Sequence, residues 1–464
     1  MARLTNIDSF FSPRSVAVVG ASNKEGSIGN VIFKNFVESA FEGAVYPVTL
    51  SYDTVLDHTA YKSVRELPEL VDLAVIAIPA PAVNTVMREC VDIGVPACVV
   101  ITGGFSEIGE NEREEELKSI IRGSDTRVIG PNCVGVYDPL TRVDTIFLPE
   151  ERMGRPNNGP ISLVSQSGAF VAAMLDWASL NGIGMGKVVS FGNKIDVNYS
   201  DLIMFFAEDK NVDVITIYME GLSKGKMFME AAAAASLKTP VVIFKSGRSK
   251  AGAAAAASHT GSLAGSDAIY DAAFRQAGAI RVYSSEELFD VARIFQCKKA
   301  PCGTRIAIIT DGGGSGVMAT DSLEDEELTL ARLDDATKSA MGEKFPPYCS
   351  VNNPIDLTGD ADATRYNVAL EEVLNDDNVD AVLLIMLFQV PTLDDEVVGH
   401  VISHSRRSEK PIIVVSSGGK YTKERVRELE EGGLVCYPTP ERGVRALSAL
   451  CHYHAYRRKK EKKG

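Results

Sequence analysis

Short runs of Val, Ile and Leu alternate along the chain with longer segments in which apolar residues recur at helical spacing. The first such runs cover residues 15–19, 45–48, 73–78, 97–101 and 128–129. Continuous apolar runs of this length are typical of strands buried on both faces of a parallel sheet, and the segments between them supply crossover helices. The pattern therefore predicts an α/β chain built from βαβ units.

The regular alternation stops after residue 129. Prolines then recur at Pro139, Pro149, Pro156 and Pro160 in a stretch with little periodicity, which favours a domain boundary near residue 150. A chain of 464 residues is too long for one hydrophobic core. We expect three domains, which cover residues 1–150, 151–300 and 301–464.

The second and third predicted domains share one plan. Residues 160–168 (PISLVSQSG) correspond to residues 305–313 (RIAIITDGG), and residues 238–247 correspond to residues 410–418. Self-similarity of this kind indicates a repeated structural unit. The sequence therefore predicts two α/β domains that arose by duplication.

The two copies differ in a loop and an acidic residue. Between Gly247 and Gly278 the first copy contains a long insertion, rich in Ala and Gly, which carries His259 and which we expect to be a loop. The first copy also ends one strand with Glu220, where the second copy has Leu387. The acid and the histidine are therefore peculiar to the first copy, and we expect its chemistry to lie there.

Composition and charge narrow the class of protein. Hydrophobic residues make up 45% and charged residues 24%, as in ordinary globular proteins. The net charge of −14 disfavours nucleic acid or an anionic membrane as a partner. The eight cysteines form no C-x-x-C pair, no signal peptide opens the chain, and no apolar run is long enough to span a bilayer. We expect a cytoplasmic protein.

A glycine-rich turn follows the first predicted strand. The strand ends at Gly20-Ala21-Ser22, and a helix begins near Gly29. Such a turn allows backbone N–H groups and the helix dipole to meet a phosphate group. The turn is not G-x-G-x-x-G, and the second strand lacks an acid at its tip, which disfavours a nicotinamide dehydrogenase. A tight turn without a ligand remains an alternative.

Small residues also follow the third and fourth predicted strands, in residues 78–81 (IPAP) and 101–104 (ITGG). The carboxyl ends of parallel strands meet at one edge of the sheet, so these turns should lie beside Gly20. Each turn alone would be an ordinary strand exit. Together they predict a groove for an extended cofactor.

A second anion site is predicted at Ser165-Gln166-Ser167-Gly168, which closes a strand and opens an apolar helix. Serine is a favoured N-cap, and the free N–H groups of the first turn attract a phosphate group. A plain helix cap is the alternative.

His259 is the histidine whose surroundings favour chemistry. A neutral imidazole can attack a phosphoryl group when a carboxylate holds its other nitrogen, and Glu220 is the candidate carboxylate. His400 and His404 are spaced i, i+4 but lack the glutamate of the zinc-protease motif, so we expect no metal site.

These motifs together resemble the α subunits of the ADP-forming acyl-CoA synthetases, such as ADP-forming acetyl-CoA synthetase, which are relatives of succinyl-CoA synthetase. The resemblance covers essentially the whole chain and is carried by residues 12–22, 129–133, 165–170, 191–193, 258–262 and 353–357. It implies an N-terminal Rossmann-like domain that binds coenzyme A, followed by two flavodoxin-like α/β domains.

The resemblance also implies roles for individual residues. His259 would be the phosphohistidine and Glu220 its supporting acid. The phosphate-binding candidates are Ser165, Gln166, Ser167, Gly168, Ser258, Thr260 and Gly261. The candidates for contact with coenzyme A are Gly20, Ala21, Ser22, Gly29, Pro79, Ile101, Thr102, Gly103 and Asn132. The third domain begins with Asp311-Gly-Gly-Gly314, and an acid there argues against another anion site.

The implied reaction converts an acyl-CoA, phosphate and ADP into a carboxylic acid, CoA and ATP through an acyl phosphate and a phosphohistidine. ADP or ATP and Mg²⁺ would bind a separate ATP-grasp β subunit, in an α₂β₂ assembly. A non-catalytic CoA-binding regulatory protein is the alternative, and the joint presence of His259 and Glu220 argues against it. The sequence leaves the acyl group and the direction of the reaction open.

Overall fold

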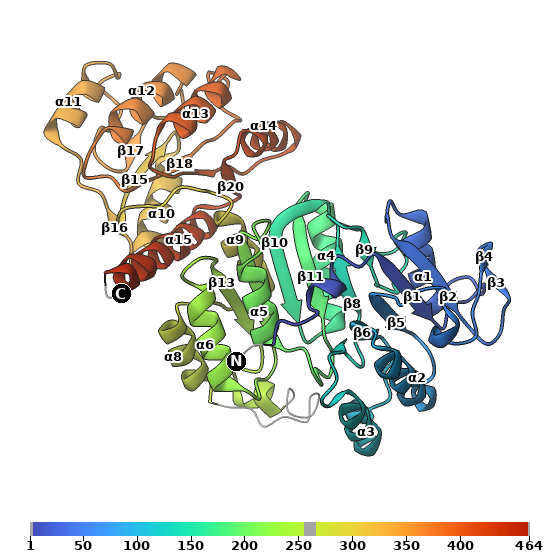
Figure 1. Cartoon of the computed structure of the whole chain (residues 1–464). Coiled ribbons are helices and arrows are strands. Elements are labelled where there is room, and N and C mark those ends of the chain that lie inside the picture. The colour runs from blue at the N-terminus through green and yellow to red at the C-terminus, as the bar shows by residue number, and fades with distance from the viewer. Residues whose placement is uncertain (1–2, 255–265, 463–464) are drawn as a thin grey trace. The chain divides into compact units, whose positions relative to one another are not determined.

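The computed structural model describes residues 3–254 and 266–462 of the chain. It divides into two compact units, Met1–Arg281 and Val282–Gly464. Strands and helices alternate through both units, and helices lie against the sheets (Figure 1). The predicted α/β class is therefore confirmed.

The first sheet has five parallel strands in the order β2-β1-β5-β6-β7. Its strands are β1 (Ser15–Val19), β2 (Ala44–Val48), β5 (Leu73–Ile76), β6 (Ala97–Val100) and β7 (Arg127–Ile129). A hairpin of β3 (Thr54–Val55) and β4 (His58–Thr59) follows β2. The three turns predicted to share an edge follow β1, β5 and β6, which are neighbours, so that prediction is confirmed.

Helices cover both faces of this Rossmann-like sheet. Ile32 and Phe36 of α1 (Ile28–Glu38) pack in one core with Val16 and Val18 of β1. The opposite face of β1 packs against α2 (Ala80–Ile93) and α3 (Asn111–Ile121). Burial on both faces explains why the strands read as continuous apolar runs.

The second sheet has seven strands in the order β14-β13-β12-β10-β11-β8-β9. They are β8 (Gly135–Asp138), β9 (Val143–Asp144), β10 (Asn158–Ser165), β11 (Met185–Ser190), β12 (Val214–Met219), β13 (Val241–Lys245) and β14 (Ile280–Val282). Helices α4 (Gly168–Leu180), α5 (Tyr199–Ala207), α6 (Gly225–Ala235) and α8 (Asp267–Ala277) belong to the same region. Strand β8 pairs antiparallel with β11, so the second sheet includes residues from the predicted first domain. The domain boundaries at 150 and 300 stay a prediction.

The third sheet lies in the second unit and has the order β16-β15-β18-β19-β20, with β17 beside β15. Its strands are β15 (Arg305–Thr310), β16 (Thr329–Leu330), β17 (Ile355–Asp356), β18 (Ala381–Ile385), β19 (Ile412–Val415) and β20 (Val435–Tyr437). Its helices are α9 (Ser285–Ile294), α10 (Gly313–Asp325), α11 (Asp335–Gly342), α12 (Ala363–Leu374), α13 (Glu396–Arg407), α14 (Lys420–Glu431) and α15 (Pro440–Glu461).

The topology confirms the duplication. In chain order within each copy, the strands β10–β14 and the strands β15, β16, β18, β19 and β20 both follow the flavodoxin-like order 2-1-3-4-5. The turns after the first strand of each copy also match. The Ser165 hydroxyl donates to the Ser167 carbonyl (2.8 Å) and accepts from the Ser167 amide (3.0 Å), and Thr310 makes the same two bonds with Gly312 (3.0 and 3.0 Å).

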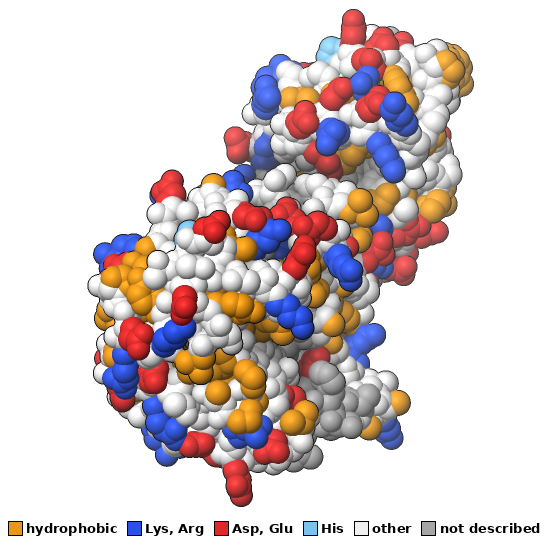
Figure 2. Space-filling model, turned by 90° about the vertical axis from the view of Figure 1, so that its right-hand side faces the viewer, with side chains coloured by type: hydrophobic (Ala, Val, Ile, Leu, Met, Phe, Trp, Pro, Cys, Tyr) orange, Lys and Arg blue, Asp and Glu red, His pale blue; other side chains and the backbone are white. Residues whose placement is uncertain are grey.

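Within the described residues, none of the helices combines the length and the apolar character needed to cross a membrane. On the face drawn in Figure 2, Lys and Arg side chains are interspersed with Asp and Glu side chains. That face therefore presents no field of a single sign.

Candidate functional site

One cavity of about 650 Å³ connects the first and second sheets. In an open parallel sheet, ligands bind outside the carboxyl ends of the strands, where the strand order reverses. The order reverses between β1 and β5 in the first sheet and between β10 and β12 in the second. The cavity is lined by Ile28, Ala77, Ile78, Pro79, Ile101, Thr102, Gly103, Asn132, Cys133, Val134, Phe147, Gln166, Ser167, Gly168 and Ala169.

The cavity brings together two groups of residues that the sequence predicted separately. Five of the coenzyme A candidates line it, namely Pro79, Ile101, Thr102, Gly103 and Asn132. Three of the phosphate-binding candidates also line it, namely Gln166, Ser167 and Gly168. A ligand with a long arm along the first sheet could therefore end beside the first turn of α4.

The other coenzyme A candidates have backbone roles. Gly20 has a φ of 98°, and a Cβ there would collide with the carbonyl oxygen of Ala77. A Cβ at Gly29 would collide with the carbonyl oxygen of Gly20. Ala21 is buried in the core, and the Ser22 hydroxyl accepts from the amide of Lys24 (3.0 Å). In the described part of the chain, these residues shape the edge of the sheet and are not among those that line the cavity.

The first turn of α4 forms part of the cavity wall. Ser167 is the N-cap, and its hydroxyl accepts from the amide of Phe170 (3.2 Å). Gly168 and Ala169 line the cavity, and the first-turn amides of a helix have no intrahelical partner. A Cβ at Gly168 would lie 2.5 Å from Val134 Cγ2, so glycine permits the close packing of this turn. Ser165 is buried, and its hydroxyl donates to the Ser167 carbonyl and closes the turn.

Gln166 connects the cavity wall to Glu220. Its Oε1 accepts hydrogen bonds from the amides of Glu220 and Gly221, both at 2.9 Å, and from the Tyr199 hydroxyl at 2.8 Å. Burial raises the pKa of Tyr218, and the neighbouring Glu220 carboxylate contributes to the rise. The predicted acid therefore lies at the end of β12, one side chain away from the cavity.

Four predicted site residues, Ser258, His259, Thr260 and Gly261, lie outside the described residues. Residues 250–254, which we expected to belong to a loop, are helical instead. Alanine is the strongest helix former, and residues 251–254 are Ala-Gly-Ala-Ala.

A polar network joins the cavity rim to the exit of β11. The Nδ2 of Asn193 donates to Glu107 Oε2 (2.7 Å) and Glu114 Oε2 (2.8 Å), and its Oδ1 accepts from Asn132 Nδ2 (3.3 Å). Burial opposes ionisation of Glu107, but hydrogen bonds from Asn193 and from the amides of Gly104 and Phe105 outweigh it and lower the pKa. Asn193 belongs to a motif that carries the resemblance, but its partners could not be read from the sequence.

The Cys133 thiol lines the cavity without the properties of a nucleophile. Burial raises the pKa of this thiol, and the sulfur hydrogen-bonds with the carbonyl of Val100 (3.2 Å). The thiol is therefore protonated and engaged in a hydrogen bond with the Val100 carbonyl. In the parts of the chain that the structure describes, no three or more His, Cys, Asp or Glu side chains gather as a metal site.

Comparison with known protein families divides the chain into three matched regions. A CoA binding domain matches residues 14–139, a succinyl-CoA ligase like flavodoxin domain matches residues 158–295, and a ligase-CoA domain matches residues 306–460.

Full-length relatives share this arrangement. The alpha subunit of acetate–CoA ligase [ADP-forming] I from Pyrococcus furiosus is 40% identical, over 99% of this chain and 100% of that protein. The acetate–CoA ligase [ADP-forming] from Methanocaldococcus jannaschii is also 40% identical, and the chain spans 62% of its length. Among solved structures, an acetyl-coenzyme A synthetase from Ca. Korarchaeum cryptofilum, in complex with phosphate and ADP, matches with a TM-score of 0.91. It is 36% identical and covers 98% of each chain.

Proposed function

Since the chain belongs to the family of alpha subunits of ADP-forming acetate–CoA ligases, we propose that it converts an acyl-CoA, phosphate and ADP into a carboxylic acid, CoA and ATP. It is an enzyme of the ligase class. The observation that carries the proposal is the single cavity, which joins the edge of a CoA-binding sheet to the first turn of α4.

The first step takes place in this cavity. The arm of coenzyme A lies along the exits of β5 and β6, past Pro79 and Thr102, and phosphate binds at the amides of Gly168 and Ala169. A phosphate oxygen attacks the thioester carbonyl carbon, the C–S bond breaks, and CoA leaves as acyl phosphate forms. Oriented amides stabilise the negative charge that develops during the attack.

The second step moves the phosphoryl group to His259. An imidazole nitrogen attacks the phosphorus of the acyl phosphate, and the carboxylic acid leaves as its carboxylate. Glu220 holds the other imidazole nitrogen and stabilises the cationic phosphohistidine. Support comes from the bond between Gln166 and the Glu220 amide, which keeps the acid beside the cavity.

The third step, the transfer of the phosphoryl group from His259 to ADP, requires a partner. We assign ADP or ATP and Mg²⁺ to a separate ATP-grasp β subunit in an α₂β₂ assembly in the cytoplasm. Relatives of matching length are named alpha subunits, and the relative from Methanocaldococcus jannaschii extends beyond the region matched by this chain, which supports a partner of this kind.

The test is to mix the chain with candidate β subunits and to measure CoA release across a panel of acyl-CoAs. The proposal expects release that depends on both phosphate and ADP. CoA binding without turnover with any β subunit would instead favour a non-catalytic CoA-binding regulatory protein.

A further inference from the structure

We propose that Lys194 is a positioning residue that fixes Glu220 beside the cavity for the transfer of the phosphoryl group, an assignment that rests on the proposed function. Lys194 follows β11, in the segment Phe191-Gly-Asn-Lys194, and has a φ of 59°. A left-handed conformation is uncommon for a lysine and directs attention to what its side chain contacts.

The Lys194 ammonium holds the strand exit that carries Glu220. Its Nζ donates to the carbonyl oxygen of Gly221 (3.2 Å) and lies over the rings of Phe191 (5.8 Å to the centroid) and Tyr199 (5.2 Å). Gln166 Oε1 binds the Glu220 and Gly221 amides. The backbone at Glu220 and Gly221 is therefore held through its N–H groups by Gln166 and through a carbonyl by Lys194.

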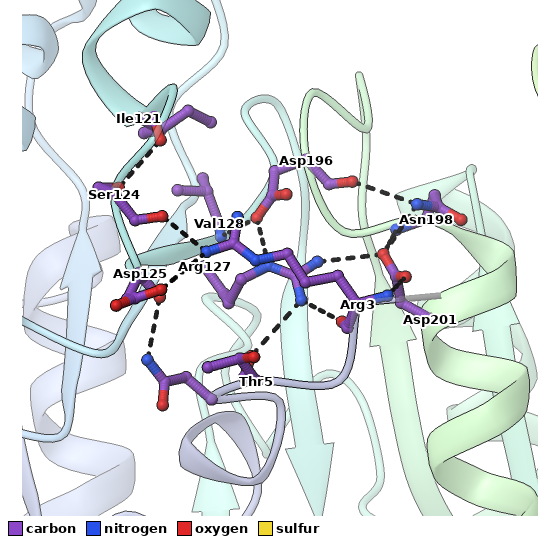
Figure 3. A network of polar contacts seen from close by, with 11 residues as sticks. Arg3, Thr5, Ile121, Ser124, Asp125, Arg127, Val128, Asp196, Asn198 and Asp201 are labelled. Atoms are coloured by element: carbon purple, nitrogen blue, oxygen red, sulfur yellow. Dashed lines mark hydrogen bonds and ion pairs between the residues drawn. The ribbon is translucent and has the colours of Figure 1, made fainter. Parts of the chain in front are cut away.

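A buried ion network holds the chain next to Lys194 in place. Arg127 is fully buried, and its guanidinium binds Asp196 (2.8 Å) and Asp201 (3.0 Å), as Figure 3 shows. Asp196 lies two residues after Lys194, and Asp201 lies in α5 with Tyr199. The backbone that follows Lys194 and the helix that carries Tyr199 are thus both bound to the guanidinium of Arg127.

In the second copy of the fold, the corresponding strand exit is held by similar hydrogen bonds without a lysine. There the carboxylate of Asp311 accepts from the Leu387 amide (3.1 Å), as Gln166 accepts from the Glu220 amide (2.9 Å). Tyr366 donates to the carbonyl of Ile385 (3.0 Å), as Tyr199 donates to that of Tyr218 (3.1 Å).

The left-handed residue ahead of α12 in this copy is Thr358, whose hydroxyl donates to the carbonyl of Leu357 (2.7 Å). The copy without the acid thus has a threonine at its left-handed residue, and the cation at that turn, Arg365, binds the Leu357 carbonyl (2.9 Å) and the Asp360 carboxylate (2.9 Å). Lys194 itself occurs in the copy that carries Glu220, and its hydrogen bond to the Gly221 carbonyl next to that acid supports a role in the reaction.

The charge of Lys194 can be removed within an accessible pH range. Burial lowers the pKa of Lys194 to about 8, and the Glu220 carboxylate partly opposes the shift. The titratable residues that line the same small pocket as Lys194 are Tyr199, Lys224 and Asp196, and the Asp196 carboxylate is already bound to Arg127. Below this pKa the ammonium holds the Gly221 carbonyl and attracts Glu220, and above it both interactions weaken.

The experiment follows labelling of the chain by acyl-CoA and labelled phosphate, without ADP, between pH 7 and pH 9.5. Wild type, Lys194→Arg, Lys194→Met and Glu220→Gln are compared. We expect the labelling rate of wild type to fall as the pH rises through about 8. The labelling rate of Lys194→Arg should not change over this range, because a guanidinium remains charged. The labelling rate of Lys194→Met should be about 10-fold lower than that of wild type at pH 7 and should not fall further as the pH rises.

Two controls separate a positioning role from a structural one. The KM for acyl-CoA should be unchanged in Lys194→Arg, because Lys194 is not among the described residues that line the cavity. Thermal melts report whether Lys194→Met is folded. If it is not, the pH dependence of Lys194→Arg tests the positioning role instead.

The outcomes also separate this assignment from the proposed function. Normal labelling of wild type with the same pH dependence in Lys194→Arg would overturn the role of Lys194 and leave the proposed function intact. Absence of labelling in wild type at every pH would remove the proposed function, and with it the role of Lys194.

Discussion

Gln166 illustrates how much of this site depends on a single side-chain atom. Its Oε1 accepts three hydrogen bonds, from Tyr199, Glu220 and Gly221, while the residue itself lines the cavity. The sequence identified Gln166 as part of a phosphate-binding turn. It could not identify these partners, because they lie 33 to 55 residues away along the chain.

A pair of substitutions at Gln166 tests this role. Gln166→Leu leaves the Glu220 and Gly221 amides without their acceptor, which should lower the free energy of unfolding by about 1–3 kcal/mol. Gln166→Glu keeps an acceptor, as Asp311 does in the second copy, and should fold normally. Its added negative charge should raise the KM for phosphate. Denaturant unfolding and phosphate kinetics check both expectations, and a Gln166→Leu variant as stable as wild type would contradict them.

Asn193 offers a test based on pH. In wild type, the hydrogen bonds that lower the pKa values of Glu107 and Glu114 contribute stability at neutral pH, which is lost as the pH falls through the lowered values. Asn193→Asp places a third carboxylate between them, and the repulsion should raise the pKa of the new group. Its destabilisation should therefore grow as the pH rises from 5 to 8.

Asn193→Ala is the matched control for that experiment. It removes the same donors without adding a charge, so its loss of stability should be similar at both pH values. Thermal melts of the three proteins at pH 5 and pH 8 provide the comparison. Equal destabilisation by Asn193→Asp at both values would contradict the close approach of the carboxylates.

Among the elements, α4 is the helix whose position matters most for the chemistry. Gly168→Ala adds a methyl group against Val134 and should shift the first turn of α4, which raises the KM for phosphate. Gly314→Ala is the control in α10, where the added methyl group meets nothing within 4 Å. It should leave kinetics unchanged and increase stability by about 0.5–1 kcal/mol, because alanine favours a helix. Equal phosphate kinetics in the two variants would contradict the role of this turn.

The link between β7 and α5 depends on the buried Arg127. Arg127→Met leaves the carboxylates of Asp196 and Asp201 without their cation, and the loss of one partner of a buried ion pair costs about 3–5 kcal/mol. Adding Asp201→Asn to Arg127→Met should recover part of this loss, because one unpaired charge is removed. Unfolding in denaturant measures both, and a double variant less stable than Arg127→Met would contradict this explanation.

At the same scale, the apolar runs predicted the central strands well, since β1, β5, β6 and residues 161–165 of β10 are buried on both faces. The short strands β8 and β9 were missed because each has only a few residues and lies in a proline-rich stretch. The helix at residues 250–254 was missed because an insertion rich in Ala and Gly was interpreted as a loop. Both errors arose where the pattern of apolar residues does not determine the structure, because the strands are very short or the segment lies in an insertion.

At the scale of the whole molecule, the duplication organises both fold and function. Internal similarity in the sequence predicted two domains of one topology, and the strand orders agree. The sequence also identified the copy that carries Glu220. It did not place Ile28 or Phe147 in the cavity, although Ile28 directly precedes the candidate Gly29, because an apolar side chain carries no motif that indicates a binding role.

The central claim is that this chain takes a phosphoryl group from an acyl phosphate onto His259. The most direct measurement is to incubate the chain with acyl-CoA and labelled phosphate, without ADP, and to map the label. The account predicts one acid-labile, base-stable label per chain at His259, which is absent in His259→Ala and forms more slowly in Glu220→Gln. Label that persists in His259→Ala, or full turnover by that variant with a β subunit, would contradict it.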